Sequence, residues 1–166
     1  MRKLLALTLL ISLFAMPALA LDFAAKHFYI QGEVAFPMGD FGDISSLGYG
    51  GGLGMMVPHN EAISFGIEAS YLMYSLEDIL GDDASFSMIP VLVLMDYNFT
   101  NSKFYALGGL GMAFSSFDNG FADESSSDFA VAVGAGFNAT PNLFLEGRYN
   151  FISDADQVTA HVGYRF

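Results

Sequence analysis

Apolar and polar residues alternate with a period of two along most of the chain after residue 20, a pattern that indicates β-strands rather than helices. Between Ala62 and Ser75, for example, apolar side chains at every second position share one face, while Ser64 and Glu68 lie on the other. The fifth segment is so rich in glycine that the pattern does not decide its facing. Eight segments of this kind are present: His27 to Phe36, Leu47 to Val57, Ala62 to Ser75, Phe86 to Phe99, Lys103 to Ser115, Asp128 to Asn138, Leu143 to Ile152 and Gln157 to Phe166.

The connections between these segments differ in length in an alternating way. Those after the second, fourth and sixth segments have about four residues and carry turn-forming residues, while those after the first, third and fifth have roughly ten. Tilted strands of about ten residues cross a bilayer, and short turns on one side with longer loops on the other are typical of outer-membrane barrels. The sequence therefore predicts an all-β fold: residues 21–166 form an eight-stranded antiparallel up-and-down transmembrane β-barrel.

The two faces of the predicted strands differ in polarity. The apolar face would contact lipid, with tyrosine and phenylalanine near the strand ends as interfacial aromatics. A charged side chain on the lipid face is costly, so the charged residues of the other face are expected inside, in a filled lumen with ion pairs around Arg148 and Arg165. The predicted interior charge cluster is Glu33, Glu68, Asp96, Glu146, Arg148, His161 and Arg165. Inward apolar residues are expected on the fourth strand, at Phe86, Met88, Leu92 and Leu94.

The first twenty residues have the features of a secretory signal peptide. Arg2 and Lys3 precede a thirteen-residue apolar run that Pro17 ends, and Ala18 and Ala20 form a small-x-small cleavage site. A helix of thirteen residues rises about 20 Å, which is short of a roughly 30 Å hydrocarbon core, so cleavage after residue 20 is favoured over a membrane anchor.

Composition narrows the possible functions. The 166 residues are 53% hydrophobic yet carry a formal charge of −12, and without Arg2 and Lys3 four basic residues face eighteen acidic ones, a charge of −14. Such a charge disfavours nucleic acid as a partner. The chain has no cysteine, and His27, His59 and His161 lack metal-ligand spacing, so no metal or other cofactor is predicted.

Twelve of the eighteen acidic residues fall in or border the three longer connections and the connection between the seventh and eighth segments, which lie on one predicted face. Oxygen-rich loops suit Ca²⁺ or Mg²⁺, but none matches an EF-hand spacing, and a solvated surface of like charge is the simpler interpretation. These residues are Asp40, Asp43, Glu77, Asp78, Asp82, Asp83, Asp118, Asp123, Glu124, Asp128, Asp154 and Asp156.

Several short motifs along the chain carry a resemblance to a known family. They are Gly32-Glu33, Pro37 to Phe41, Gly48 to Gly54, Tyr105, Gly109 to Gly111 and Val162 to Phe166. With these motifs the chain resembles the small outer-membrane β-barrel proteins of the OmpA-like and OmpX-like kind, often grouped as porin-family barrels of Gram-negative bacteria. The resemblance implies an outer-membrane location, contact with lipid and lipopolysaccharide, insertion by the barrel-assembly machinery and both termini in the periplasm. A monomer is expected. Val162, Tyr164 and Phe166 resemble the terminal signal that this machinery reads.

Several functions are compatible with such a barrel. The favoured one is a structural or interaction role in the cell envelope, with acidic loops facing the exterior. The alternative is a narrow channel for ions or small hydrophobic solutes. A lipid-modifying enzyme is disfavoured because no serine is placed beside His161, and a soluble lipocalin-like barrel is disfavoured by the loop asymmetry and the terminal phenylalanine. No catalytic residue is predicted.

Overall fold

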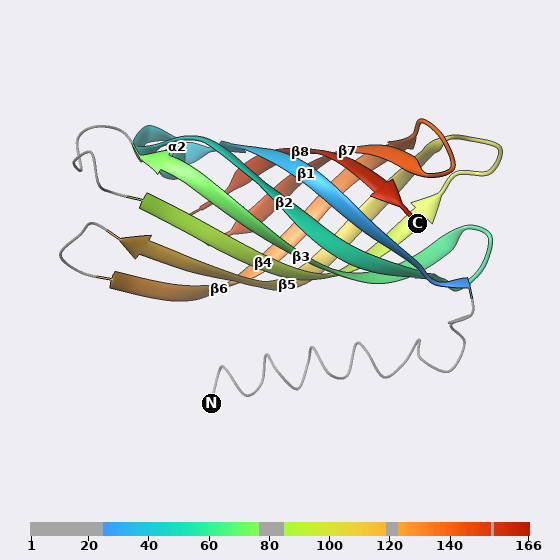
Figure 1. Ribbon diagram of the computed structural model, residues 1–166, viewed down its shortest axis with the longest axis horizontal. Helices are drawn as coiled ribbons and strands as arrows, with labels where there is room; N and C mark the ends of the chain where they lie inside the picture. The colour runs from blue at the N-terminus through green and yellow to red at the C-terminus, as the bar shows by residue number, and fades with distance from the viewer. Residues whose placement is uncertain (1–24, 77–84, 119–122, 154) are drawn as a thin grey trace, which may run out of the picture.

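The strands of the computed structural model form one closed antiparallel barrel, as predicted (Figure 1). The structure describes residues 25–76, 85–118, 123–153 and 155–166. Each strand pairs with the next, and β1 pairs with β8 to close the sheet into a barrel. The elements are β1 (His27–Pro37), α2 (Gly39–Ile44), β2 (Ser45–Pro58), β3 (Ile63–Leu76), β4 (Ser85–Asn98), β5 (Phe104–Asp118), β6 (Asp123–Asn138), β7 (Leu143–Ile152) and β8 (Gln157–Arg165).

The two ends of the barrel differ. At the turn end, on the right in Figure 1, lie three short turns together with the first residue of β1 and the last of β8. At the loop end lie α2 and the opposite ends of the strands. The last residue is hydrogen-bonded into the sheet, because the Phe166 N–H donates to the Phe28 carbonyl over 3.0 Å. The closure of the barrel therefore extends to the final residue of the chain.

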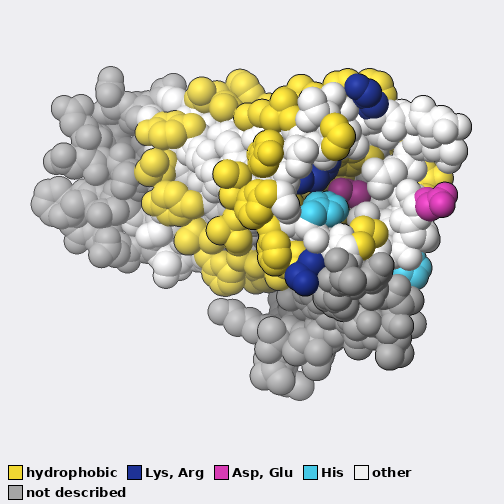
Figure 2. All heavy atoms as spheres, turned by 45° about the vertical axis from the view of Figure 1, so that its right-hand side comes forward, with side chains coloured by type: hydrophobic (Ala, Val, Ile, Leu, Met, Phe, Trp, Pro, Cys, Tyr) yellow, Lys and Arg dark blue, Asp and Glu magenta, His cyan; other side chains and the backbone are white. Residues whose placement is uncertain are grey.

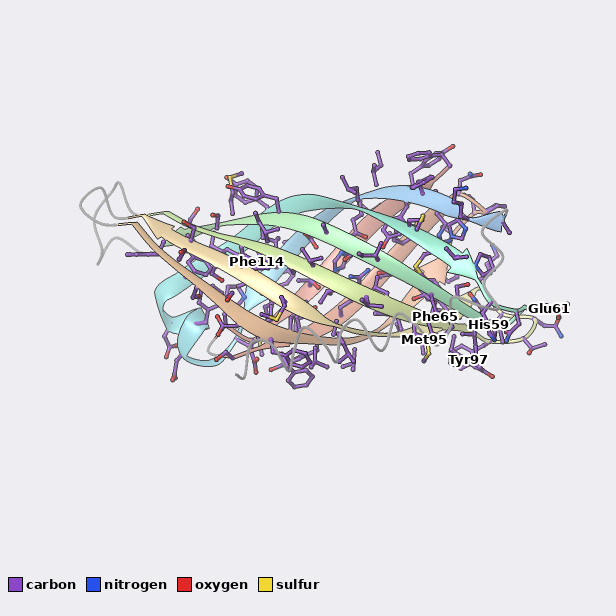
Figure 3. All side chains as sticks on the ribbon, turned by 90° about the horizontal axis from the view of Figure 1, so that it is seen from below. His59, Glu61, Phe65, Met95, Tyr97 and Phe114 are labelled. Carbon is purple, nitrogen blue, oxygen red and sulfur yellow. The ribbon has the colours of Figure 1, made fainter. Side chains whose placement is uncertain are left out.

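The outward face is apolar, as the alternation predicted. Figure 3 labels Phe65, Met95 and Tyr97 near the turn end and Phe114 toward the loop end, all pointing away from the barrel. Neighbouring aromatic rings contact each other on this surface, with 5.0 Å between the ring centroids of Phe104 and Phe137, for example. A space-filling view shows hydrophobic side chains gathered across the middle of the visible face of the barrel (Figure 2). The surface has the apolar band and aromatic rims that a bilayer requires.

The fifth strand now has a defined facing. Tyr105 and Leu107 are buried in the lumen, while Phe104 and Phe114 are exposed. The inward positions that follow Leu107 are Gly109, Gly111 and Ala113, all buried. Because these residues are small, hydrophobicity alone could not distinguish the two faces of the strand.

The strands β5 and β6 are longer than predicted. The hydrophobic pattern stops near Ser115 and resumes at Asp128, but β5 and β6 stay paired to Asp118 and Asp123. The prediction that Asp118, Asp123 and Glu124 lie in a loop is therefore wrong: they belong to strands. The physical reason is that backbone pairing continues where the side chains no longer need to be apolar. The predicted cleavage residues Ala18 and Ala20, and the acidic residues Glu77, Asp78, Asp82, Asp83 and Asp154, lie outside the described residues.

This extension makes the barrel wall uneven in height. The pairing of β6 with β7 begins at Ala130 opposite Ile152, so seven residues of β6, Asp123 to Phe129, have no partner on the β7 side. Seven strand residues rise about 23 Å along the strand. We call this part of β5 and β6, Ser115–Asp118 and Asp123–Phe129, the outer hairpin. In Figure 1 it reaches beyond β7 and β8 at the loop end.

Within the described part of the chain, no helix is long and apolar enough to cross a membrane.

Candidate functional site

A buried arginine lies at the centre of the lumen. Arg148 on β7 contacts Glu68 of β3 with both terminal nitrogens, at 2.5 and 2.9 Å, and it donates from Nε to Glu146 over 2.8 Å. The side chains of all three residues are at most 5% exposed. An arginine held by two carboxylates in this fork geometry is strongly oriented. Strand alternation explains the arrangement, since all three residues occupy inward positions.

Two tyrosines complete this central cluster. The Tyr29 hydroxyl donates to Glu68 over 2.7 Å, and the Tyr105 hydroxyl donates to Glu146 over 2.5 Å. Each carboxylate therefore accepts from the guanidinium and from a phenol, which compensates part of its lost hydration. These two tyrosines were not among the residues predicted to lie inside. They are separated from inward residues by an even number of positions, Tyr29 from Glu33 on β1 and Tyr105 from Leu107 on β5, and this spacing could have placed them inside.

A second polar group lies beside the central cluster. Nδ1 of His161 lies 3.2 Å from Glu33, and its Nε2 lies 2.8 Å from the Thr159 hydroxyl, which also accepts from Asn150 over 2.9 Å. A carboxylate, an imidazole and a hydroxyl in line have the composition of a nucleophile relay. Thr159 is only 1% exposed, however, and is held by two neighbours. The hydroxyl is therefore buried inside the lumen, and Oε1 of Glu33 and Nδ1 of His161 have no hydrogen-bond partner in this group.

Arg165 and Asp96 lie apart from these ion pairs, near the turn end. Arg165 donates to the Asn138 side-chain oxygen, and its guanidinium lies 4.5 Å from the centroid of the Phe144 ring. Among the described residues no salt bridge includes Arg165 or Asp96, although the charges of Arg148 and Arg165 both act on the Asp96 carboxyl group. The prediction of ion pairs around both arginines is thus wrong for Arg165, which an amide and aromatic rings hold instead.

The opposite wall of the lumen is apolar. Met88, Leu92 and Leu94 on β4 are buried, and Phe86 packs against the same core, as predicted for these four residues. The lumen consequently has a polar wall, mainly from β1, β3, β7 and β8, that faces an apolar wall from β4, β5 and β6.

An aromatic plug closes the lumen toward the loop end. Phe41 extends from α2 into the barrel, where its ring centroid lies 5.3 Å from that of Tyr74 and 5.2 Å from that of Phe86. The Tyr74 hydroxyl donates to the Gln157 side chain across the barrel. We call Phe41, Tyr74 and Phe86 the aromatic plug. The sequence pattern predicted that Phe41 lies in a loop. The signal that could have indicated its burial is a large apolar residue flanked by glycine and aspartate.

The acidic residues predicted to lie in the loops occupy different environments in the structure. Asp40 and Asp43 lie in α2 and are exposed, whereas Asp156 accepts hydrogen bonds from the Ile152 N–H and the Tyr149 hydroxyl. In the described ranges no group of three or more His, Cys, Asp or Glu residues is arranged to hold a metal ion.

Val162, Tyr164 and Phe166 all point outward and are 50–66% exposed. Their position on the closing strand is compatible with a terminal signal for assembly, which stays a prediction.

Comparison with known proteins identifies the fold. Residues 6–166 match the model of the outer membrane protein β-barrel domain family. The solved structure of Ail, the attachment invasion locus protein of Yersinia pestis, has a TM-score of 0.60 at 20% identity and covers 85% of this chain and 97% of that chain. The N-terminal β-barrel domain of Pseudomonas aeruginosa OprF has a TM-score of 0.61 at 13% identity, with 84% and 97% coverage. At these identities the structures show the fold alone. The curated proteins contain no match.

Proposed function

Because the chain belongs to the outer membrane protein β-barrel domain family, we propose that it has a structural and interaction role in the cell envelope and presents its loop end to the exterior. The protein is located in the outer membrane, as the family shows. The observation that carries the proposal is the outer hairpin, which extends beyond β7 and β8 while the lumen beneath it is filled.

The filled lumen argues against transport. The central cluster occupies the middle of the barrel, and the aromatic plug closes it toward the loop end. An eight-stranded barrel is just wide enough for its interior side chains to fill it. A protein that does not pass solutes acts through its surface, and the outer hairpin belongs to the surface at the loop end.

The outer hairpin has the composition of a solvated surface. Ser125 and Ser126 are exposed and pair across the ladder with Ser116 and Ser115, so polar side chains lie on both faces. Phe129 adds one exposed aromatic side chain at the base of the hairpin. One edge of this hairpin has no β7 partner, which leaves backbone groups available for contact with another molecule. We assign the interaction role to this segment.

A shortened hairpin tests the proposal. Replacement of residues 115–126 by Asn-Gly joins Phe114 to Ser127, which lie opposite each other in the ladder, through a favoured two-residue turn. In a strain that lacks the gene, the wild-type chain should restore growth in medium that contains detergent and a chelator. The shortened chain should still insert into the membrane but should restore this growth poorly. Equal restoration by both chains would contradict the assignment to the hairpin.

A narrow channel is the second candidate. The observation that favours it is the apolar wall at Met88, Leu92 and Leu94, which would suit a small hydrophobic solute. This route requires displacement of Phe41 from Tyr74 and Phe86. A Phe41→Ala variant should therefore leave solute entry into cells unchanged if the protein is not a channel, and a rise in entry would favour the second candidate.

A further inference from the structure

A cavity opens at the turn end of the barrel, opposite the outer hairpin. It has a volume of about 330 Å³ and is lined by side chains from several strands and from the turn between β6 and β7. This volume is at the lower end of the range of small-ligand sites, roughly 300–1,000 Å³. In Figure 2, which brings the turn end forward, basic, acidic and histidine side chains come into view together. The cavity plays no part in the proposed envelope role.

The floor of the cavity carries an unpaired carboxylate. Asp96 on β4 is only 9% exposed, and it lines both the main cavity and a smaller hollow of about 10 Å³ toward the lumen. Among the described residues it forms neither a hydrogen bond nor an ion pair. A carboxylate this buried without a partner is costly, so a cation placed in the cavity would be stabilised.

The wall of the cavity carries an oriented guanidinium. Arg165 lies over the rings of Phe144 and Tyr105, at 4.5 and 5.7 Å from their centroids, and is anchored to Asn138. The five N–H donors of an arginine exceed those used in these contacts. Arg165 and Asp96 line the same cavity yet do not pair with each other. A single cation or a single anion would leave one of the two charges uncompensated.

Neutral amides fill the space around these charges. Asn98, Asn138 and Asn142 line the cavity, and each side chain has both a donor and an acceptor, the functional groups that complement a peptide bond. Met56 and Pro141 add a small apolar surface. The lining therefore combines the Asp96 carboxylate, the Arg165 guanidinium, the His27 imidazole and several amides.

We propose that this cavity binds a small zwitterion, a free α-amino acid or a short peptide, with its ammonium group at Asp96 and its carboxylate at Arg165. The asparagine amides bind the polar groups between the two ends of the ligand. With the loop end outside, the site faces the periplasm, so its ligand comes from that compartment. The proposal is independent of the role assigned to the outer hairpin, and either can fail alone.

Calorimetry on the full chain in detergent micelles tests the proposal. The probes are L-alanine and L-alanyl-L-alanine, with N-acetyl-alanyl-alanine and alanyl-alanine amide as matched peptides that lack the ammonium or the carboxylate. At least one zwitterion should bind, and loss of either charged end should weaken binding at least about tenfold.

Substitution of either charged residue of the cavity should weaken binding in the same way as removal of a charged end of the ligand. Asp96→Asn and Arg165→Gln should each weaken binding of the zwitterion at least about tenfold. Glu61→Gln is the matched control, because Glu61 is exposed at the turn between β2 and β3 and does not line the cavity. If Arg165→Gln fails to fold, the amidated peptide on the wild-type chain still tests the contact with Arg165.

Three results would overturn the proposal. The first is absence of heat with both zwitterions at millimolar concentration. The second is equal binding of the zwitterion and a peptide that lacks one charge. The third is binding that Asp96→Asn leaves unchanged. Side-chain amide signals of Asn98, Asn138 and Asn142 in NMR spectra give an independent readout, and they should shift with the zwitterion and stay unchanged with the doubly blocked peptide.

Discussion

Small residues inside the barrel make room for large ones. Gly136 on β6 faces the ring of Tyr105, and Gly163 on β8 faces the ring of Phe144. Both rings are about 1% exposed, and the Tyr105 hydroxyl holds Glu146 in the central cluster. A side chain at either glycine would overlap the ring, so these glycines are required by close packing rather than by backbone conformation.

An alanine at Gly136 should therefore destabilise the folded barrel, by about 1–3 kcal/mol as for other overpacked cores. The control is Gly32→Ala, because a Cβ at Gly32 meets no atom within 4 Å. Urea titration of the barrel in lipid vesicles measures both variants. Equal midpoints for Gly136→Ala and Gly32→Ala would contradict the packing argument.

The central cluster depends on one positive charge between two negative ones. Replacement of Arg148 by methionine leaves Glu68 and Glu146 buried without their cation, which should cost about 3–5 kcal/mol of folding free energy. The thermal midpoint of the folded form, followed by its gel mobility, should fall.

Lys103→Met is the matched control for this substitution. It also removes one positive charge, but Lys103 is exposed at the turn end, and its loss should change the free energy of unfolding by no more than about 0.5 kcal/mol. An unchanged midpoint for Arg148→Met would show that Arg148 is not a buried ion-pair partner.

At the scale of the strands, the outer hairpin marks the end of the barrel that we expect to face the cell exterior. The chain has no cysteine, so single cysteines can be placed at Ser126 in the hairpin and at Ser102 in a short turn. Both side chains are exposed. On intact cells a membrane-impermeant maleimide should label Ser126→Cys and not Ser102→Cys, and the opposite result would invert the orientation.

The closing strand β8 makes a second prediction at this scale. Deletion of Phe166 removes the hydrogen bond to Phe28 and the last outward aromatic, so the yield of folded protein in the outer-membrane fraction should fall. Phe104→Ala, which removes another exposed aromatic at the turn end, should have a smaller effect. Equal yields for the deletion and the wild-type chain would break the link between Phe166 and assembly.

The alternation of apolar and polar residues predicted the strands that cross the membrane. It failed for the ends of β5 and β6 and for Phe41. It placed Glu68, Arg148 and His161 inward because the lipid excludes charge. It could not extend β5 and β6 beyond the lipid, since paired backbone in water places no demand on side-chain polarity. It could not place Phe41, because the position of an apolar residue in a loop depends on the rings of Tyr74 and Phe86, which are distant in sequence.

At the scale of the whole molecule, the barrel divides into three regions along its axis. The turn end holds the cavity with Asp96 and Arg165, the middle holds the central cluster, and the loop end holds the aromatic plug beneath the outer hairpin. Ion pairs and aromatic contacts thus fill the lumen where it crosses the membrane. The proposed envelope role depends on this filling, because a continuous water path would make the barrel a channel.

Single-channel recording in planar bilayers tests the filled lumen most directly. The wild-type barrel should give no stable openings at either polarity, because the central cluster and the aromatic plug occupy the lumen. Stable openings that vanish when Arg148 is replaced would contradict this structure of the lumen and would favour a narrow channel over the envelope role.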